Sequence, residues 1–201
     1  MGLLDLFRRA RGTGWLPDLP DIRDAPLDRL RGGAAALPEA FTLRHPAVTV
    51  RNQGGASSCV GFAWAQALEL AYAHHGVLTG DLSPAFIYFL ARATHGAAGL
   101  DSGTYLRAAA KAVARFGCAS ERSHPYSVLF INQSPPWSAY RDAYDRKGLR
   151  GYYRVDAHDL DAVRWAISTG RPVVGGWTVD KTFLDYRGGG ILGPTTGTPV
   201  G

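Results

Sequence analysis

The apolar positions that follow residue 58 have the pattern of a buried helix. Between residues 59 and 75, only Gln66 and Glu69 are strongly polar before two histidines at the end of the segment. A helix that is apolar nearly all round is typical of a protein interior, and Gly76 is suited to end it. The pattern therefore predicts a buried central helix that starts at Cys59.

Two more helices are predicted further along the chain. Ser83 followed by Pro84 places a capping side chain before a proline at the first helical position, which predicts a second helix to about Thr94. A third helix is expected from residues 102–104 to Gly117, with apolar side chains on one face. The opposite face carries three basic side chains, Arg107, Lys111 and Arg115. Such a stripe is typical of a solvated helix face.

The second half of the chain has a more β-like character. Residues 151–155 and residues 172–179 each have the composition of a strand, and so do residues 47–52 in the first half. A short helix is expected at residues 159–169, closed by Gly170. Helices in the first half followed by strands in the second half indicate the α+β class.

The segment from residue 12 to residue 38 is rich in proline, glycine, aspartate and arginine. Prolines at this density break helices and remove donors from a sheet, so the segment is expected to be extended. It is either a linker or an arm laid over the rest of the molecule. In the second case its apolar side chains, Trp15, Leu19 and Ile22, are the expected anchors.

Length and charge narrow the classes of protein only a little. With 201 residues, of which 46% are hydrophobic, the chain can hold one domain or two small lobes that share an interface. Its 22 basic and 17 acidic residues give a net charge of +5. Only Arg8, Arg9 and Arg11 cluster, whereas nucleic-acid-binding domains concentrate basic residues on one face. We therefore expect no nucleic-acid partner, and the oligomeric state is left open.

Neither membrane insertion nor export is expected. The longest apolar stretches fall short of the roughly 20 residues of a spanning helix. At the N-terminus the basic residues follow the apolar ones, which is the wrong order for a secretory signal. The two cysteines, Cys59 and Cys118, are too few for a disulfide framework. Both are expected to be reduced, in a cytoplasmic compartment.

Cys59 stands where a loop of small residues turns into the predicted central helix, which Ser57 or Ser58 can cap. The dipole and the backbone N–H groups of a helix N-terminus favour the thiolate, which is the reactive form of cysteine. Gln53 lies six residues earlier, and its amide together with the Cys59 N–H would form a two-donor oxyanion hole. A cysteine that leads an apolar helix is more often part of the core, so position alone leaves both interpretations open.

Residues 50–63 closely resemble the active-site segment of papain-like cysteine peptidases. The shared features are a Val-x-Asn-Gln-Gly lead, a loop rich in glycine and serine, and the spacing from Gln53 to the nucleophile Cys59. Weaker matches follow in the family's order between about residue 37 and residue 201, at Leu37-Pro38, Leu82-Ser83-Pro84, Asp101-Ser102-Gly103, Ser123-His124-Pro125-Tyr126 and Arg171-Pro172-Val173. Residues 14–21 resemble the leader of bacterial and phage-type members.

The resemblance implies a papain-like α+β fold of two lobes. An extended segment, residues 1–36, would precede a helical lobe, residues 37–135, and the beginning of a β lobe, residues 136–201. The helix that starts at Cys59 would be the centre of the helical lobe. In many secreted members a cysteine that forms a disulfide stands where this chain has Ala56, and its loss is consistent with a reducing compartment.

The resemblance also implies a cysteine peptidase that acts on peptide or protein substrates. Cys59 would attack the peptide carbonyl and form a thioacyl intermediate, while Gln53 holds the oxyanion. Ser102 and Gly103 would bind the substrate backbone as an antiparallel partner. No metal or organic cofactor is implied.

The family's catalytic histidine has no convincing counterpart in the sequence. When the alignment is continued, this histidine is expected within one or two residues after Gly201, and the family's asparagine follows it. His74 and His75 lie about 22 Å along the helix of Cys59, at 1.5 Å per residue. The other histidines, His45, His95, His124 and His158, match nothing catalytic in the family.

A chain that ends at Gly201 would therefore have a nucleophile without a base, and at most residual turnover is expected of it. One alternative is a catalytically inactive papain-like domain that binds peptides or proteins. A second is a truncated fragment of a longer protein. A related cysteine chemistry, acyl transfer to an amine, also stays open, since only the acceptor distinguishes it from hydrolysis.

Overall fold

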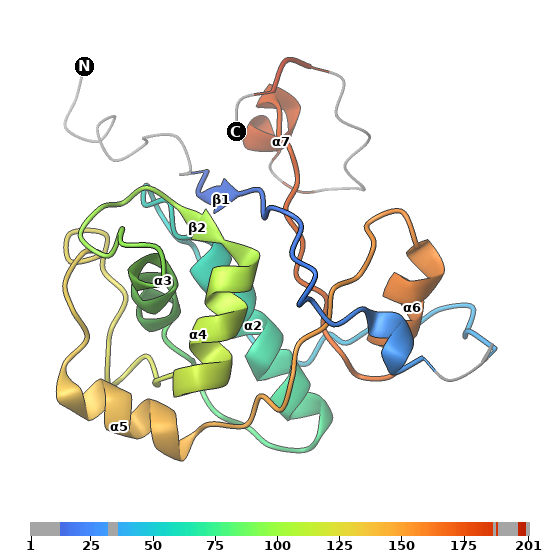
Figure 1. Ribbon diagram of the computed structural model, residues 1–201, viewed down its shortest axis with the longest axis horizontal. Helices are drawn as coiled ribbons and strands as arrows, with labels where there is room; N and C mark the ends of the chain where they lie inside the picture. Colours follow the sequence, from blue (N-terminus) through green and yellow to red (C-terminus); the bar gives the residue numbers. More distant parts are fainter. Residues whose placement is uncertain (1–12, 32–35, 187, 189–196, 200–201) are drawn as a thin grey trace.

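The computed structural model describes residues 13–31, 36–186, 188 and 197–199 (Figure 1). The basic cluster at Arg8, Arg9 and Arg11 lies outside the described residues. The elements in chain order are β1 (Trp15–Leu16), a 3-10 helix (Leu27–Arg29), α2 (Cys59–His74), α3 (Pro84–Ala93), β2 (Thr104–Tyr105), α4 (Leu106–Phe116), α5 (Trp137–Asp145), α6 (Leu160–Ser168) and α7 (Lys181–Asp185). No helix among these described residues is long and apolar enough to cross a membrane.

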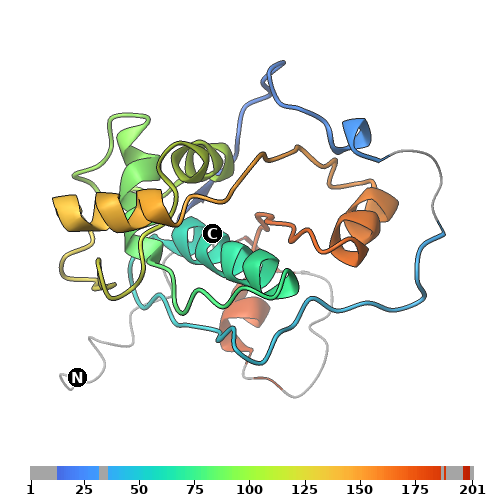
Figure 2. The ribbon, with the colours of Figure 1, turned by 90° about the horizontal axis from the view of Figure 1, so that it is seen from below.

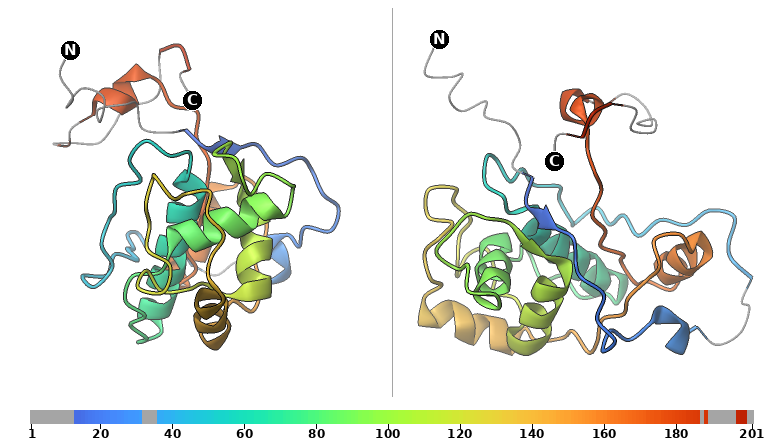
Figure 3. Two further views of the ribbon diagram at one scale, coloured as in Figure 1. Left: turned by 90° about the vertical axis from the view of Figure 1, so that its left-hand side faces the viewer. Right: turned by 45° about the horizontal axis from the view of Figure 1, so that its top comes forward.

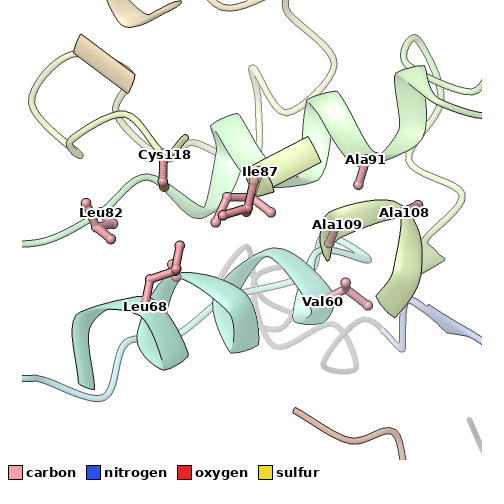
Figure 4. Close-up of a cluster of buried hydrophobic side chains, with 10 residues drawn as sticks. Val60, Leu68, Leu82, Ile87, Ala91, Ala108, Ala109 and Cys118 are labelled. Atoms are coloured by element: carbon pink, nitrogen blue, oxygen red, sulfur yellow. The ribbon is translucent and has the colours of Figure 1, made fainter. Parts of the chain in front are cut away.

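Helices α2, α3 and α4 pack together around the main hydrophobic core (Figure 4). The buried members of this core are Val60, Ala65, Leu68, Leu82, Ile87, Ala91, Ala108, Ala109, Val113 and Cys118. Small residues let the helices approach closely, and a Cβ added at Gly61 would come within 2.5 Å of the Pro84 carbonyl oxygen. The predicted helix that starts at Cys59 is thus confirmed, and its buried residues are Val60, Gly61, Ala65, Leu68, Glu69 and Ala73.

The second helix begins where its local sequence predicts, whereas the third begins later. The Ser83 hydroxyl accepts a hydrogen bond of 3.1 Å from the Phe86 N–H, with Pro84 at the first helical position, as the sequence predicts. Helix α4 starts at Leu106, later than the predicted residues 102–104. The delay arises because the two preceding residues form β2, which pairs in parallel with β1.

Helix α5 was not predicted from the sequence, because Pro135 and Pro136 indicate a break in the chain. Pro136 instead stands directly before the first helical residue, where its φ of −69° is tolerated. Ala139 and Ala143 are fully buried against Phe86 in a second core cluster. The packed helices therefore extend to Asp145, while the lobe limits proposed from the sequence stay a prediction.

The three segments predicted as strands, residues 47–52, 151–155 and 172–179, are not strands in the structure. Only Arg154 forms a bridge, in which its N–H donates to the Ala25 carbonyl at 2.8 Å and its carbonyl accepts from Leu27 N at 3.0 Å. A strand needs a neighbouring strand to pair its backbone groups. Over the described ranges, residues 47–52 and 172–179 have no such neighbour.

Helix α6 lies apart from the main core (Figures 1 and 2). It agrees with the predicted helix at 159–169, and the Asp159 carboxylate caps it by accepting from Ala162 N at 2.8 Å. Ala162 and Ala166 pack against Leu27 of the 3-10 helix in a small separate cluster. The N-terminal segment is therefore an integral part of the packing around α6.

Residues 13–31 form an arm that lies along the molecule, which selects the second of the two predicted alternatives. Trp15 packs against the main core, but Leu19 and Ile22 are 77% and 104% exposed, so two of the three predicted anchors are wrong. Arg107 of α4 holds the arm instead, through Asp24 at 2.6 and 2.8 Å and the Leu19 carbonyl at 2.7 Å. The prediction of a solvated basic stripe is thus wrong for Arg107.

Candidate active site

Cys59 is the first residue of α2, and it is half-buried at the end of a tight loop. The sequence predicts that Ser57 or Ser58 caps the helix, but the Ser58 hydroxyl makes no capping hydrogen bond. It bonds instead to the hydroxyl of Tyr126 at 2.7 Å, and Tyr126 donates its single hydrogen to the Gln53 carbonyl at 2.6 Å. Ser58 is therefore the donor to Tyr126. One phenol thus fixes both ends of the loop that leads to Cys59.

Gln53 opens this loop, and its side chain turns toward the loop's interior. The Gln53 amide Nε2 donates to the carbonyl of Ala56 at 2.8 Å. Gly54 has a φ of +65°, and its N–H donates to the Asn52 side chain at 2.9 Å, so the backbone turns sharply here. The role of Gln53 as an oxyanion donor to the substrate stays a prediction.

Arg51, two residues before Gln53, anchors the approach to the loop. Its guanidinium donates to Glu69 of α2 at 2.7 Å and to the Leu82 carbonyl at 2.8 Å. Glu69 is only 4% exposed, although the sequence marks it as a polar position on the helix. Burial raises the pKa of both Glu69 and Glu121, which also faces Arg51, at 3.7 Å. One arginine thus pairs with two carboxyl groups, the buried Glu69 and the half-buried Glu121.

The turn predicted to bind substrate lies beside the loop of Cys59. The N–H of Ser57 donates to both carboxylate oxygens of Asp101, at 3.0 and 3.1 Å. The buried Tyr88 hydroxyl donates to Asp101 Oδ1 at 2.7 Å and accepts from the Gly103 N–H at 2.9 Å. Gly103 is buried with a φ of +78°, and Ser102 is exposed. The structure thereby links Gly103 to the nucleophile loop, through two side chains to which the sequence assigned no role.

Arg92 lies one helical turn after Tyr88 and also contacts the turn that contains Asp101. It is fully buried, and its guanidinium stacks 3.9 Å from the centre of the Tyr88 ring. It donates to the carbonyl of Leu100, directly before Asp101, and to the carbonyl of Ile131 at 2.6 Å. A buried arginine in an apolar helix is the signal from which this arrangement could have been inferred, because such a charge needs partners.

The N-terminal arm passes over the site between the nucleophile loop and the turn (Figure 3). The Gly14 carbonyl accepts a hydrogen bond of 2.8 Å from the Thr104 N–H. A Cβ added at Gly14 would come within 1.7 Å of the Ser57 carbonyl oxygen, and one added at Gly103 within 2.4 Å of the Gly14 carbonyl oxygen. Trp15 continues this contact, with its ring against Gly176. Only glycine fits this crossing.

The histidines make contacts elsewhere in the described structure. His95 bonds to the Thr104 hydroxyl at 3.1 Å, and the N–H of His158 donates to Asp156. His124 is half-buried, and this burial lowers its pKa. None of the hydrogen bonds found for the six histidines in the described ranges reaches Cys59. Cys118 is buried in the main core, where desolvation raises the pKa of its thiol.

A half-buried cysteine leads the central helix of this α+β fold, and a glycine-containing turn is linked by hydrogen bonds to the loop before it. The family model described as "Papain family cysteine protease" matches residues 37–198, and the chain belongs to this family. Its fold is papain-like.

Individual relatives agree with this assignment. An uncharacterised peptidase C1-like protein of Acanthamoeba polyphaga mimivirus is 28% identical over 206 residues, covering 90% of this chain and 66% of its own length. Xylellain, a cysteine protease from Xylella fastidiosa, superimposes with a TM-score of 0.70 at 27% identity over 80% of this chain and 64% of its own. Digestive procathepsin L 3 of Tenebrio molitor has the same fold, with a TM-score of 0.55 at 23% identity, covering 79% of this chain and 47% of its own. The chain thus spans about two thirds or less of the length of these relatives.

Proposed function

We propose that the protein hydrolyses peptide bonds, with Cys59 as the nucleophile. The observation that supports this most strongly is the position of Cys59, which is half-buried at the start of α2 with its loop bonded to the Asp101–Gly103 turn. The loop of Cys59 lies beside β2, with which an extended peptide could pair in place of β1 of the arm. Membership of the papain family gives the same reaction class.

The chemistry proceeds in two steps. The Cys59 sulfur attacks the peptide carbonyl carbon, and the resulting oxyanion accepts hydrogen bonds from the Gln53 amide and the Cys59 N–H. The C–N bond then breaks, a protonated amine leaves, and an acyl thioester remains on Cys59. Water attacks the thioester and releases the carboxylic acid and the thiol. Ser102 and Gly103 would hold the substrate backbone during both steps.

A histidine base and an orienting asparagine are needed to move the proton in this mechanism. We propose that residues beyond Gly201 supply both, because the relatives with this fold are longer. The relation to bacterial and phage-type members remains part of the proposal. So does a reducing, cytoplasmic location, which would keep Cys59 and Cys118 as free thiols.

The test is hydrolysis of a mixture of quenched fluorogenic peptides by the protein made from its complete gene, with its intact mass measured. We expect Cys59→Ala to abolish turnover, while Cys118→Ser leaves it largely intact. An active Cys59→Ala variant would contradict the assignment of the nucleophile.

An inactive peptide-binding domain is the second candidate, since no histidine hydrogen bond in the described ranges reaches Cys59. A native protein with an intact mass equal to that of residues 1–201, which binds peptides without forming a thioester, would support this candidate instead. Formation of an acyl-enzyme, visible as a mass increase on Cys59, distinguishes the two. An amine that increases product formation from that acyl-enzyme would indicate acyl transfer.

A further inference from the structure

We propose that Asp101 and Tyr88 are positioning residues that hold the substrate-binding turn in register with the nucleophile. This inference rests on the proposed peptidase function, and it assigns roles to two side chains outside the expected nucleophile, oxyanion donor and substrate-binding residues. The pair is called the Asp101–Tyr88 strap below. It joins the loop before Cys59 to the turn that ends at Gly103.

The first half of the strap is the contact of Asp101 with the nucleophile loop. Both carboxylate oxygens of Asp101 accept the N–H of Ser57, at 3.0 and 3.1 Å. Ser57 lies two residues before Cys59, and Asp101 lies two residues before Gly103. The bond therefore joins two short segments that are 44 residues apart in the chain, each close to a group that would contact the substrate.

The second half is the hydroxyl of Tyr88, which is fully buried in α3. It accepts from the Gly103 N–H at 2.9 Å, so its only hydrogen is left for Asp101 Oδ1 at 2.7 Å. This arrangement requires an acceptor at Asp101 and a protonated phenol at Tyr88. Burial raises the pKa of Tyr88, which keeps the phenol in that form.

Helix α3 provides a rigid base for the strap. Arg92 lies one turn after Tyr88, stacks on its ring, and donates to the Leu100 carbonyl next to Asp101. Arg92 also binds the Ile131 carbonyl at 2.6 Å and the Asn132 side chain at 2.5 Å. Tyr88 is thus held by the core, and Arg92 holds the residue that precedes Asp101.

The strap has a direct mechanistic consequence. A peptide bound along Gly103 reaches the Cys59 sulfur correctly only if the turn and the loop keep a fixed separation. Small errors in such a separation lower the rate of a reaction between positioned groups by large factors. The intrinsic reactivity of the thiol toward a small reagent, by contrast, does not depend on the turn. The strap should therefore affect reaction with peptides and not reaction with small electrophiles.

The experiment compares the rates at which two alkylating agents react with Cys59 in the protein made from its complete gene. A dipeptidyl chloromethyl ketone forms a bond from the Cys59 sulfur to its methylene carbon, with loss of chloride, and it binds as a peptide. Iodoacetamide alkylates the same sulfur with loss of iodide and carries no peptide. The ratio of the two second-order rate constants at Cys59, followed by intact mass, measures how well the turn presents a peptide to the thiol.

Tyr88→Phe should lower this ratio about tenfold or more, because both hydrogen bonds of the hydroxyl are lost, and Asp101→Asn by roughly ten- to a hundredfold, because the carboxyl group that accepts from Ser57 and Tyr88 is lost. The matched controls are Tyr72→Phe and Asp142→Asn. Tyr72 donates its hydroxyl hydrogen to a backbone carbonyl, that of Arg146 at 2.9 Å, and Asp142, like Asp101, accepts a backbone N–H, that of Ser120 at 2.7 Å. The controls should leave the ratio unchanged whatever they do to the melting temperature.

Three outcomes are distinguishable. A reduced ratio in Tyr88→Phe or Asp101→Asn, with unchanged iodoacetamide rates, supports the strap. A wild-type preference for the peptidyl reagent that both variants retain overturns the strap and leaves the proposed function standing. Absence of any preference for the peptidyl reagent, both in the wild type and in Gly14→Val, where the arm no longer fits against Ser57, overturns the proposed function and the strap with it. Asp101 is exposed, so its variant stays informative if Tyr88→Phe does not fold.

Discussion

The carbonyl oxygen of Gly14 accepts a hydrogen bond of 2.8 Å from the N–H of Thr104, the residue that follows Gly103. The arm thereby pairs in parallel with β2, the edge next to which a substrate was expected to pair in the antiparallel direction. An extended peptide that reaches Gly103 needs the space that Gly14 now fills. The arm and a substrate therefore exclude each other at this position.

Gly14→Val should consequently release the arm from the site, because its Cβ would lie within 1.7 Å of the Ser57 carbonyl oxygen. We expect faster alkylation of Cys59 by the dipeptidyl chloromethyl ketone, by about tenfold if one backbone hydrogen bond and its packing are lost. Leu19→Ala, which changes an exposed side chain of the same arm, is the control and should have no effect. An unchanged rate in Gly14→Val would show that the arm does not restrict access.

Arg107 is the main polar anchor of the arm, through its paired bonds to Asp24 and its bond to the Leu19 carbonyl. Arg107→Met keeps the aliphatic packing of the side chain and removes these charged hydrogen bonds. The population in which the arm is detached should rise about tenfold or more. Limited trypsin digestion measures this as faster cleavage after Arg23.

Lys111→Met is the matched control for Arg107→Met, since Lys111 is exposed on the same helix. It should leave the rate of cleavage after Arg23 unchanged. Equal cleavage rates for the wild type and Arg107→Met would contradict the anchoring role, because the arm would then be held without the guanidinium.

The two cysteines should differ sharply in reactivity. Cys118 is 3% exposed in the main core, and burial raises the pKa of its thiol, whereas Cys59 is half-buried at the surface. In the folded protein at pH 8 we expect iodoacetamide to modify Cys59 alone, and both cysteines after denaturation. Peptide mapping of the alkylated protein distinguishes the two sites. Rapid labelling of native Cys118 would mean that the α2–α4 core opens readily.

Glu121 gives the stability a definite dependence on pH. Burial raises its pKa above the ordinary 4.5, so the folded protein keeps this proton to a higher pH than the unfolded chain does. The contribution of Glu121 to the free energy of unfolding is thus greatest below pH 4.5 and is lost as the pH rises through the folded-state pKa. Glu121→Gln should therefore gain stability relative to the wild type between pH 4.5 and 7.

Urea denaturation of both proteins across this range measures the difference. Glu39→Gln, at an exposed position, is the control and should show a pH dependence parallel to that of the wild type. A constant difference between Glu121→Gln and the wild type at all pH values would contradict the sign argued here.

The helices that the sequence predicts well are those with strong local signals. The apolar run after Cys59 and the Ser83–Pro84 pair each specify a start without reference to the rest of the chain. Helix α5 and the three segments predicted as strands depend on neighbours. Ala139 and Ala143 become a helical face only when Phe86 is beside them, and a β-rich segment becomes a strand only when another strand pairs with it.

The same distinction between local and long-range signals applies to the residues of the candidate site. Cys59, Gln53 and Gly103 are predicted as site residues from spacing and family resemblance, because those signals lie within short segments. Tyr88 cannot, since in an apolar helix a tyrosine resembles a core residue, and its partners are 13 and 15 residues away. Arg107 resembles a solvated charge until Asp24, 83 residues earlier, is placed beside it. Long-range polar pairing is the information that a one-dimensional pattern lacks.

The crossing of Gly14 over the site has a consequence for how the protein would respond to its substrate. Because the arm belongs to the same chain, its engagement is an intramolecular equilibrium that dilution of the protein does not weaken. A tethered segment acts at an effective concentration on the order of millimolar. The apparent affinity for a free peptide is the intrinsic affinity multiplied by the fraction of molecules in which the arm has left. The strength of the arm contacts, and not only the chemistry at Cys59, would therefore set the substrate concentration at which the protein begins to work.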